Sequence, residues 1–535
     1  MTATEALGLL ALPVCAVAVA ALARRLGLSS PPVLVIAGLA ASFLPGLPEV
    51  RLDPEVALFV FLPPLLFAAA WESSYHNLRE HIRPIGLLSV GLVLFTTFAV
   101  GYAAYLVVPG LALAPAFVLA ALVAPPDAVA AVGVARRLGL PRRVVTILVG
   151  EGLFNDATAL TMFRVALAAA VGAGFSLVDG AGRFVFAAVA GTVVGLLLGP
   201  VLHWLGGRLN DPLVETVIPI LAPFAAYLTA EALHASGVIA VVVTGLYLGH
   251  RSTRSDARTR LLSRSFWTVV VFVLEAVVFV LIGLQLPLIL DMLLSTRNWV
   301  TLSWNAVVIF AVVAVARFVW VLPSAYIPLW FSRRIRQRES GVDWRHRVVV
   351  AWAGMRGVVS LAAAFAIPLK TDAGVMFPGR DLVLFFTFTT VLATLLVQGL
   401  TFPGLVRWLR VGSEAEDHAD AVAEAGAHHE AGKAGLDRLE KLAREETGPF
   451  AGEAADRLRQ HVEDRRFRAW ERLGGGTGPS GEEVPTAVYR RFRREMLAAE
   501  RAVFIRLRDE RRIDDEVLQR ILHELDLEEI MLLRE

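Results

Sequence analysis

The sequence predicts an all-α membrane protein with about thirteen transmembrane helices in two inverted repeats, followed by a cytoplasmic helical tail. Of its 535 residues, 56% are hydrophobic and only 19% are charged, whereas a soluble protein carries roughly a quarter charged residues. Apolar runs of about 20 residues, long enough to cross a bilayer, recur as far as Arg410. Two runs in matching positions of the two halves contain helix-breaking residues, a pattern typical of inverted repeats with a site at the midplane.

The first apolar segment is predicted to remain as a membrane helix. It opens with Glu5 and places Arg24 and Arg25 after the apolar stretch, unlike a cleaved signal peptide. It also contains the single cysteine, Cys15, so no disulfide framework is expected. The predicted spans are approximately residues 5–23, 31–45, 54–71, 84–108, 113–135, 144–171, 184–204, 213–232, 235–249, 266–290, 300–330, 348–369 and 382–409.

Positive charge alternates between the predicted loops. One set of loops holds Arg24, Arg25, Arg79, Arg83, Arg136, Arg137, Arg142, Arg143, Arg208, Arg251, Arg254, Arg258, Arg260, Arg264, Arg333, Arg334, Arg336, Arg338, Arg345 and Arg347. The other set holds only Arg51, Arg183, Arg297, Lys370 and Arg380. Because basic loops stay on the cytoplasmic side, the N-terminus is predicted outside and the C-terminus inside. The net charge of +2 gives no electrostatic case for binding nucleic acid.

The composition changes near residue 412. Residues 1–411 are predicted to form the transmembrane domain, and residues 412–535 a mainly helical cytoplasmic tail with a flexible joint at 474–479. No motif assigns the tail a role. A solvated helical segment and a regulatory or dimer-stabilising segment both remain open.

The sixth span carries polar residues where a membrane helix is normally apolar. Glu151 and Asn155 are four residues apart and share a helix face, and Asp156 is turned by one more position. An acid at the bilayer centre costs about 2.5–3.5 kcal/mol even on the lenient scale, so such residues by default mark a site or pathway. The alternative is that these groups only hold neighbouring helices together.

The fifth and twelfth spans are interrupted. The fifth contains Ala124-Pro125-Pro126-Asp127, in which consecutive prolines remove amide donors and break the helix. Freed carbonyls at membrane depth are tolerated inside protein or beside a wet cavity, so Asp127 is predicted to belong to a site. The alternative is a proline kink with Asp127 as an N-cap. The twelfth span combines flexible backbone and a charge in Gly354-Met355-Arg356-Gly357. Spans 1–6 and 8–13 would be the repeats.

Buried cations in these spans need counter-charges, because a lone guanidinium in the membrane is costly. Glu151 is the predicted partner of Arg356, which leaves Asp156 free to titrate. The partner of Arg317, in the eleventh span, is open between Glu275 and Glu231.

Five stretches, in order and at appropriate spacing, resemble those of bacterial sodium/proton antiporters of the cation:proton antiporter-1 family. They are Leu62–Phe67 (LPPLLF), Pro126–Ala130 (PDAVA), Gly150–Ala159 (GEGLFNDATA), His234–Gly245 (HASGVIAVVVTG) and Trp352–Ala362 (WAGMRGVVSLA). The resemblance covers residues 5–410. It implies about thirteen spans, a homodimer, and a six-helix core domain that moves against a dimerisation domain.

The resemblance also implies residue roles. Asp156 is expected to bind the cation or the proton, with Asn155 orienting the site. Glu151 is expected to pair with Arg356, and Asp127 to lie where two unwound helices cross. The Asn-Asp pair is similar to that of the electroneutral branch, which exchanges one cation for one proton.

The sequence departs from the family pattern in three places. The usual Thr-Asp-Pro at the break is Pro126–Ala128, and Gly152 stands where a hydroxyl is usual. The acid that usually follows LPPLLF is replaced by Ala68, and Glu72 is a candidate substitute. Asp156 therefore has fewer expected side-chain ligands. The transported cation is predicted to be Na⁺, with K⁺ or Li⁺ as alternatives.

The sequence as a whole predicts a secondary-active antiporter in the plasma membrane. It would exchange Na⁺, or K⁺ or Li⁺, for H⁺ by competition at Asp156, with Asp127 as a second ligand and no prosthetic group. No nucleophile–base arrangement favours an enzyme. The alternative is an ion sensor or channel of the same fold with a signalling tail.

Overall fold

The structure is a computed structural model. It describes residues 3–44, 58–172, 177–209, 211–254, 256–285, 298–331, 343–412, 414–445, 451–473 and 485–534. The predicted glycine-rich joint at 474–479 and the predicted basic loop at 333–338 lie outside these residues, as do Arg51 and Arg297. The chain divides into two units, Met1–Gly412 and Ser413–Glu535.

The regular secondary structure in the described part of the first unit is helical, and the only β-type pairing there is an isolated bridge between Lys370 and Met376. Its helices are α1 (Ala3–Arg25), α2 (Ser30–Ala41), α4 (Leu62–Trp71), α5 (Tyr75–Glu80), α6 (Ile82–Gly86), the π-helix η1 (Leu87–Leu92), α7 (Val93–Val107), α8 (Leu113–Val123), α9 (Ala128–Arg137), α10 (Arg142–Val171), α11 (Leu177–Leu209), α12 (Pro212–Ala232), α13 (Gly237–Arg251), the 3₁₀-helix η2 (Ser252–Arg254), α14 (Ala257–Leu284), α16 (Trp299–Phe331), α18 (Trp344–Trp352), α19 (Val358–Phe365), α20 (Arg380–Ala393), the π-helix η3 (Thr394–Gln398) and α21 (Gly399–Leu409).

Helices of this unit overlap the predicted spans in their described residues, and the count of thirteen crossings stays a prediction. Five helical stretches in the described residues are long and apolar enough to cross a membrane: 82–107, 180–208, 257–284, 299–324 and 380–409. The predicted fifth and twelfth spans are each two helices with a break, α8 with α9 and α18 with α19. The prolines and glycines identified in the sequence therefore do interrupt these two segments.

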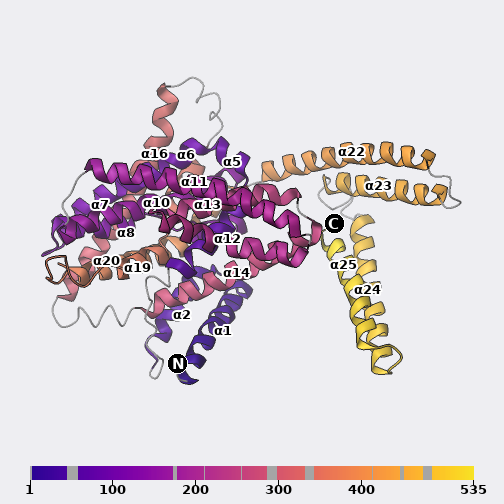
Figure 1. Ribbon diagram of the computed structural model, residues 1–535, viewed down its shortest axis with the longest axis horizontal. Helices are drawn as coiled ribbons and strands as arrows, with labels where there is room; N and C mark the ends of the chain where they lie inside the picture. Colours follow the sequence, from indigo (N-terminus) through magenta and orange to yellow (C-terminus); the bar gives the residue numbers. More distant parts are fainter. Residues whose placement is uncertain are drawn as a thin grey trace. The chain divides into compact units, whose positions relative to one another are not determined.

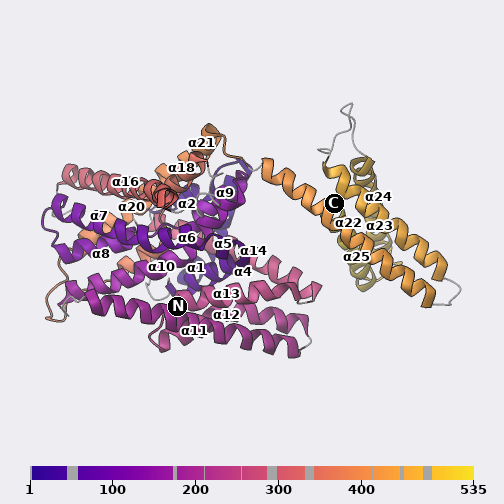
Figure 2. The same ribbon diagram turned by 90° about the horizontal axis from the view of Figure 1, so that it is seen from above.

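Helix α10, which carries the polar stretch, lies between two apolar cores. Val144 and Leu148 belong to a large core built mainly from α8, α14, α19 and α20. Val149 and Leu153 belong to a second core with α4 and α13. Helices α7, α8 and α10 lie side by side in both views of the fold (Figures 1 and 2). This position encloses the polar residues of α10 in protein on several sides.

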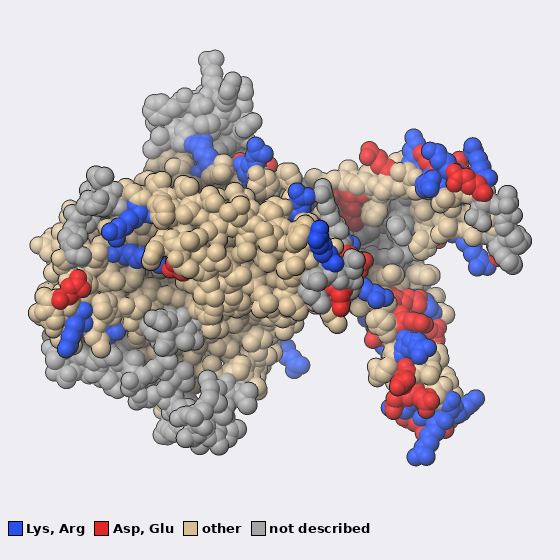
Figure 3. Space-filling view, viewed as in Figure 1, with Lys and Arg blue, Asp and Glu red and all other residues tan. Residues whose placement is uncertain are grey.

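The surfaces of the two units differ. On the visible face of the first unit few charged side chains appear, whereas the tail helices carry both signs of charge (Figure 3). The tail consists of α22 (Glu414–Glu445), α23 (Ala451–Leu473), α24 (Pro485–Asp509) and α25 (Asp515–Arg534). Helices α24 and α25 pack through Leu497, Leu525 and Leu532. An apolar surface is suited to lipid and a charged one to water.

Candidate ion-binding site

The two helix breaks meet at Asp127. Its backbone N–H donates to the carbonyl oxygen of Met355 at 2.6 Å, so the gap after α8 is hydrogen-bonded to the gap before α19. A Cβ on Gly357 would lie 1.9 Å from Oδ2 of Asp127, so only glycine allows the carboxylate to approach this backbone. The breaks thus satisfy part of each other's exposed backbone, as non-helical chain at membrane depth requires.

Asn155 fastens α10 to the same break. Its Nδ2 donates to the carbonyl oxygen of Pro126 at 2.6 Å. The proline pair ends α8 and frees this carbonyl, and the amide of Asn155 supplies the missing donor. Asn155 is fully buried, and its Oδ1 has no hydrogen-bond partner among the residues that the structure describes. An unpartnered buried amide oxygen is costly unless a ligand or water meets it.

Asp156 is the second unpartnered group. Its side chain is buried, at 8% exposure, and within the described part of the chain it has no hydrogen-bond or ion-pair partner. Asp127 is its electrostatic neighbour, so two carboxylates repel each other here. The carboxylates of Asp156 and Asp127 and the Oδ1 of Asn155 are hard oxygen groups, the type of ligand that alkali cations prefer. A cation or a proton would relieve both the repulsion and the burial of charge.

Glu151 does form an ion pair, but the prediction that Arg356 is its partner is wrong. Glu151 is held by Arg317, whose Nη1 and Nη2 donate to Oε1 and Oε2 at 2.5 and 2.8 Å. Arg317 also donates to the carbonyl oxygen of Val350, at 3.0 and 3.2 Å. The packing of α16 against α18 brings Arg317 to this position, and neither Glu275 nor Glu231 is its partner.

Arg356 hydrogen-bonds to backbone carbonyls and not to Glu151. Its Nε donates to the carbonyl oxygen of Val123 at 3.0 Å, and its Nη1 donates to the carbonyl oxygen of Gly354. Its own N–H donates to Oγ1 of Thr394, in the π-helix η3, at 3.1 Å. Val123 is the last residue of α8, so a cation stands at the negative end of that helix. This explains why Arg356 can be buried without a carboxylate in direct contact.

Glu72 does not reach the site. It forms an ion pair with Arg136 at 2.8 Å, and both side chains are exposed. Ala68 is buried, so the position after LPPLLF offers no oxygen ligand. Glu72, which the sequence left open as a replacement for the acid missing at Ala68, instead follows the last turn of α4, where Arg136 near the C-terminus of α9 is its ion-pair partner.

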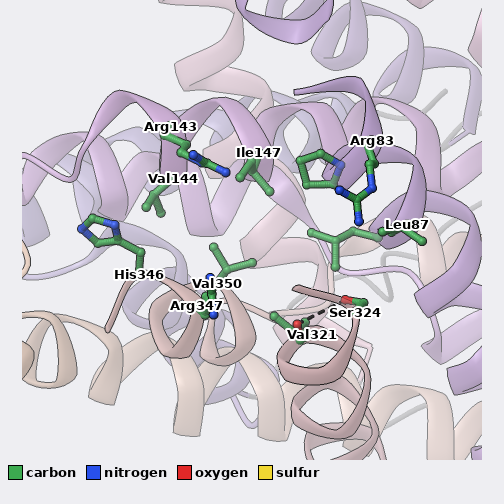
Figure 4. Close-up of a pocket in the computed structure, with 12 residues that line it drawn as sticks. Arg83, Leu87, Arg143, Val144, Ile147, Val321, Ser324, His346, Arg347 and Val350 are labelled. Atoms are coloured by element: carbon green, nitrogen blue, oxygen red, sulfur yellow. Dashed lines mark hydrogen bonds between the residues drawn. The ribbon is translucent and has the colours of Figure 1, made fainter. Parts of the chain in front are cut away.

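The basic pocket beside α10 is a different kind of cavity. It has a volume of about 80 Å³ and is lined by Arg83, Arg143, His346 and Arg347 together with apolar residues and Ser324 (Figure 4). No acid is among its lining residues. Three arginines repel a cation, so this pocket is not a candidate for the cation site.

Three residues that support the site were not predicted from the sequence to do so. Val350 offers its carbonyl to Arg317, Thr394 its hydroxyl to Arg356, and Gly357 its lack of a side chain to Asp127. Gly357 had a signal in the sequence, since it closes the glycine-bounded break of the twelfth span. The other two carried none, because a carbonyl and a lone threonine in an apolar run are not distinctive.

The fold and this buried, acidic, helix-break site define a multi-pass membrane protein of the ion-exchanging class. The chain matches the family described as "Sodium/hydrogen exchanger, transmembrane" over residues 12–408. It therefore belongs to the sodium/hydrogen exchanger family. It is 35% identical over 517 residues to an uncharacterized Na⁺/H⁺ exchanger of Mycobacterium tuberculosis, covering 96% of this chain and 93% of that protein.

Two further likenesses extend this result. The chain is 33% identical over 378 residues to a protein of Bacillus subtilis named as a sodium, potassium, lithium and rubidium/H⁺ antiporter, covering 68% of this chain and 56% of that one. The structure of the sodium proton antiporter MjNhaP1 from Methanocaldococcus jannaschii superposes with a TM-score of 0.57 at 19% identity, covering 76% of this chain and 99% of that one. The likeness to MjNhaP1 shows a shared fold.

Proposed function

We propose that the protein exchanges a monovalent cation for H⁺ by competition of the two at Asp156. The observation that carries this is a buried carboxylate with no partner in the described residues, beside an equally unpartnered Oδ1 of Asn155 and the carboxylate of Asp127. A proton and a cation each neutralise this site, and one carboxylate cannot hold both at once. Membership of the sodium/hydrogen exchanger family supports the same exchange.

The ion pair beside the site has a structural role in this proposal. Glu151 is fully engaged by Arg317, so it is not available to the transported ion. Asn155 fixes the distance between α10 and the helix break through Pro126. The cation would then be bound by Asp156, Asp127 and Asn155, with backbone carbonyls and water completing its shell.

The predicted substrate is Na⁺, with K⁺ and Li⁺ as further candidates. Few side-chain oxygens surround Asp156, because Gly152 and Ala68 supply none. A site completed by water discriminates weakly between alkali ions. The relative named as a sodium, potassium, lithium and rubidium/H⁺ antiporter supports such breadth.

The proposal includes electroneutral one-for-one exchange by alternating access in the plasma membrane, with the N-terminus outside and the tail in the cytoplasm. The Asn-Asp pair supports the stoichiometry, and the basic loops support the orientation. A homodimer is proposed from the family resemblance.

Proteoliposomes test this function. An acidic interior would be reported by an enclosed pH dye while Na⁺, Li⁺ or K⁺ is added outside, with the voltage clamped. We expect at least one cation to dissipate the gradient, Asp156→Asn to abolish the response, and the exposed control Asp372→Asn to keep it. Exchange at the wild-type rate by folded Asp156→Asn would refute the role of Asp156. Current without a need for a proton gradient would indicate a channel.

A further inference from the structure

A small polar pocket lies at the far end of α9 from Asp127. Its volume is about 40 Å³. Four elements line it: α1, the start of α2, α9 and α14. The polar lining residues are Arg24, Ser29, Ser30, Arg137 and Glu275. None of these residues belongs to the site at Asp156.

Three side chains in this pocket bring oxygens that nothing in the described protein satisfies. Oγ of Ser29 and Oγ of Ser30 are buried without a hydrogen-bond partner, and Ser30 is only 9% exposed. Ser29 is the N-cap residue of α2, yet its hydroxyl makes no capping bond. The half-buried carboxylate of Glu275 likewise has no hydrogen bond or ion pair among the described residues. Unpartnered oxygens that share a pocket are suited to bind water or a ligand.

The two arginines of the pocket do not supply that ligand. The guanidinium of Arg24 lies over the ring of Phe272, 4.1 Å from its centroid. Nη1 of Arg137 donates to the carbonyl oxygen of Leu28 at 3.3 Å. Both cations are thus held by other groups, although the charges of Asp127, Arg24, Arg136 and Arg137 all act on Glu275.

The position of the pocket connects it to the ion site. Gly133 lines the pocket from α9, and Asp127 precedes the first residue of the same helix. Six residues of helix separate the two by about 9 Å. The opposite wall is α2 packed tightly on α14, where Gly38 and Gly283 let the backbones touch. The helix α9, by contrast, packs on α10 and α21. The pocket therefore lies between α9, which begins beside Asp127, and the packed helices α1, α2 and α14.

We propose that this pocket is a transit site for the partly hydrated transported cation, held by the carboxylate of Glu275 and the hydroxyls of Ser29 and Ser30. The inference rests on the proposed function, since it assigns the pocket to the same cation. The cation stops there between the basic face of the protein and the carboxylates of Asp127 and Asp156.

The chemistry of the pocket fits such a stop. One carboxylate and two hydroxyls are hard oxygen ligands, and water completes the shell of an alkali ion. A pocket of about 40 Å³ has room for an ion with a water or two, since a single water needs roughly 10–15 Å³. The nearby arginines keep the affinity low. A transit site must bind strongly enough to be entered and weakly enough to be left.

The test measures the cation dependence of exchange from each face separately. Vesicles of both orientations would be sorted by protease access to the tail, and the apparent KM for Na⁺ (or for the cation that proves best) measured in each. We expect Glu275→Gln to raise KM five- to tenfold at the face bearing Arg24 and Arg137, and less than twofold at the other face. Ser30→Ala, which keeps the packing, would raise it two- to threefold at the same face.

A second pair of variants tests the pocket without touching its ligands. No atom lies within 4 Å of a Cβ added at Gly133, so Gly133→Leu fills the pocket without displacing backbone. We expect it to slow exchange, whereas Gly182→Leu, an open and exposed position on α11, leaves the rate unchanged. Glu215→Gln is the matched acid control, since Glu215 instead accepts from Thr259 at 2.9 Å.

The outcomes separate this inference from the proposed function. Wild-type KM at both faces in Glu275→Gln and Ser30→Ala, with Asp156→Asn inactive, would overturn the transit site and leave the function standing. An equal rise at both faces would also overturn it, because the residues would then act on the central site. Exchange by Asp156→Asn would overturn the proposed function, whatever the KM values of the pocket variants.

Discussion

Arg317 and Glu151 form a bidentate ion pair with distances of 2.5 and 2.8 Å, although 166 residues separate them in the chain. Both side chains are almost completely buried. The pair ties α16 to α10, and the additional bonds from Arg317 to Val350 tie both to α18. One guanidinium thus links three helices, one of which, α10, carries Asn155 and Asp156.

Breaking this pair from one side should be severely destabilising. We expect Glu151→Gln and Arg317→Met each to lower the free energy of unfolding by about 3–5 kcal/mol, because each change leaves the buried charge of the other residue unpaired. Removing both partners should cost less than the sum of the single changes. Thermal unfolding of the purified protein, followed by fluorescence-detected size exclusion, measures this. Additive losses would show that the two side chains do not depend on each other.

Asn155 should matter through its amide donor. Asn155→Ala removes the bond to Pro126 and leaves that carbonyl unsatisfied, at a net cost of about 1–1.5 kcal/mol. If the lost hydrogen bond destabilises the cation-bound state by this amount, the KM for the cation rises roughly tenfold. Asn155→Asp should be worse, because an ionised carboxylate cannot donate to a carbonyl and adds a third negative charge. Equal KM values for wild type and Asn155→Ala would contradict this role.

Gly357 should tolerate no side chain. Its φ of −127° and ψ of −162° are accessible to any residue, so the constraint is steric and not conformational. Gly357→Ala would place Cβ 1.9 Å from the Asp127 carboxylate and push it away. We expect loss of exchange at preserved expression, measured in the proteoliposome assay. Gly86→Ala, at an open position of α6, is the matched control and should remain active.

The contact between α24 and α25 should be stable at neutral pH and weaken only in acid. Arg493 hydrogen-bonds Glu528 at 2.6 and 2.8 Å and lowers the pKa of that carboxyl below its ordinary 4.5. A lowered pKa stabilises the contact above pH 4.5, and this stabilisation disappears as the pH falls through the lower, folded-state value.

Energy transfer between dyes on α24 and α25, in full-length protein with Cys15 replaced by Ser, would follow this contact. We expect unchanged transfer from pH 7 to 5 and a decrease below about pH 4. Arg493→Gln should weaken the contact by about 0.2–1 kcal/mol, as for an exposed pair. Arg494→Gln, at an exposed position without an ion pair in the described residues, should not. A decrease already at pH 6 would show that other groups control the contact.

Several features were predictable from the sequence because they are local. Two prolines break a helix wherever it packs, so the interruption before Asp127 was predicted and is present. The unusual polarity of Glu151, Asn155 and Asp156 in an apolar run was visible in the same way, and all three are buried. The choice of Glu151 for Arg356 failed because chemistry alone could not distinguish two arginines in neighbouring spans.

The sequence by itself determined that this is a multi-pass helical membrane protein of the exchanger family, with acids in its sixth segment and breaks in its fifth and twelfth. Length, hydropathy and backbone chemistry are properties of short stretches, and these settle such questions. Only the tertiary structure decided that Arg317 binds Glu151, that Glu72 turns to Arg136, and that Glu275 joins Ser29 and Ser30 in one pocket. These pairings depend on how each helix is rotated and shifted against its neighbours, and many weak packing contacts along the whole chain fix that arrangement.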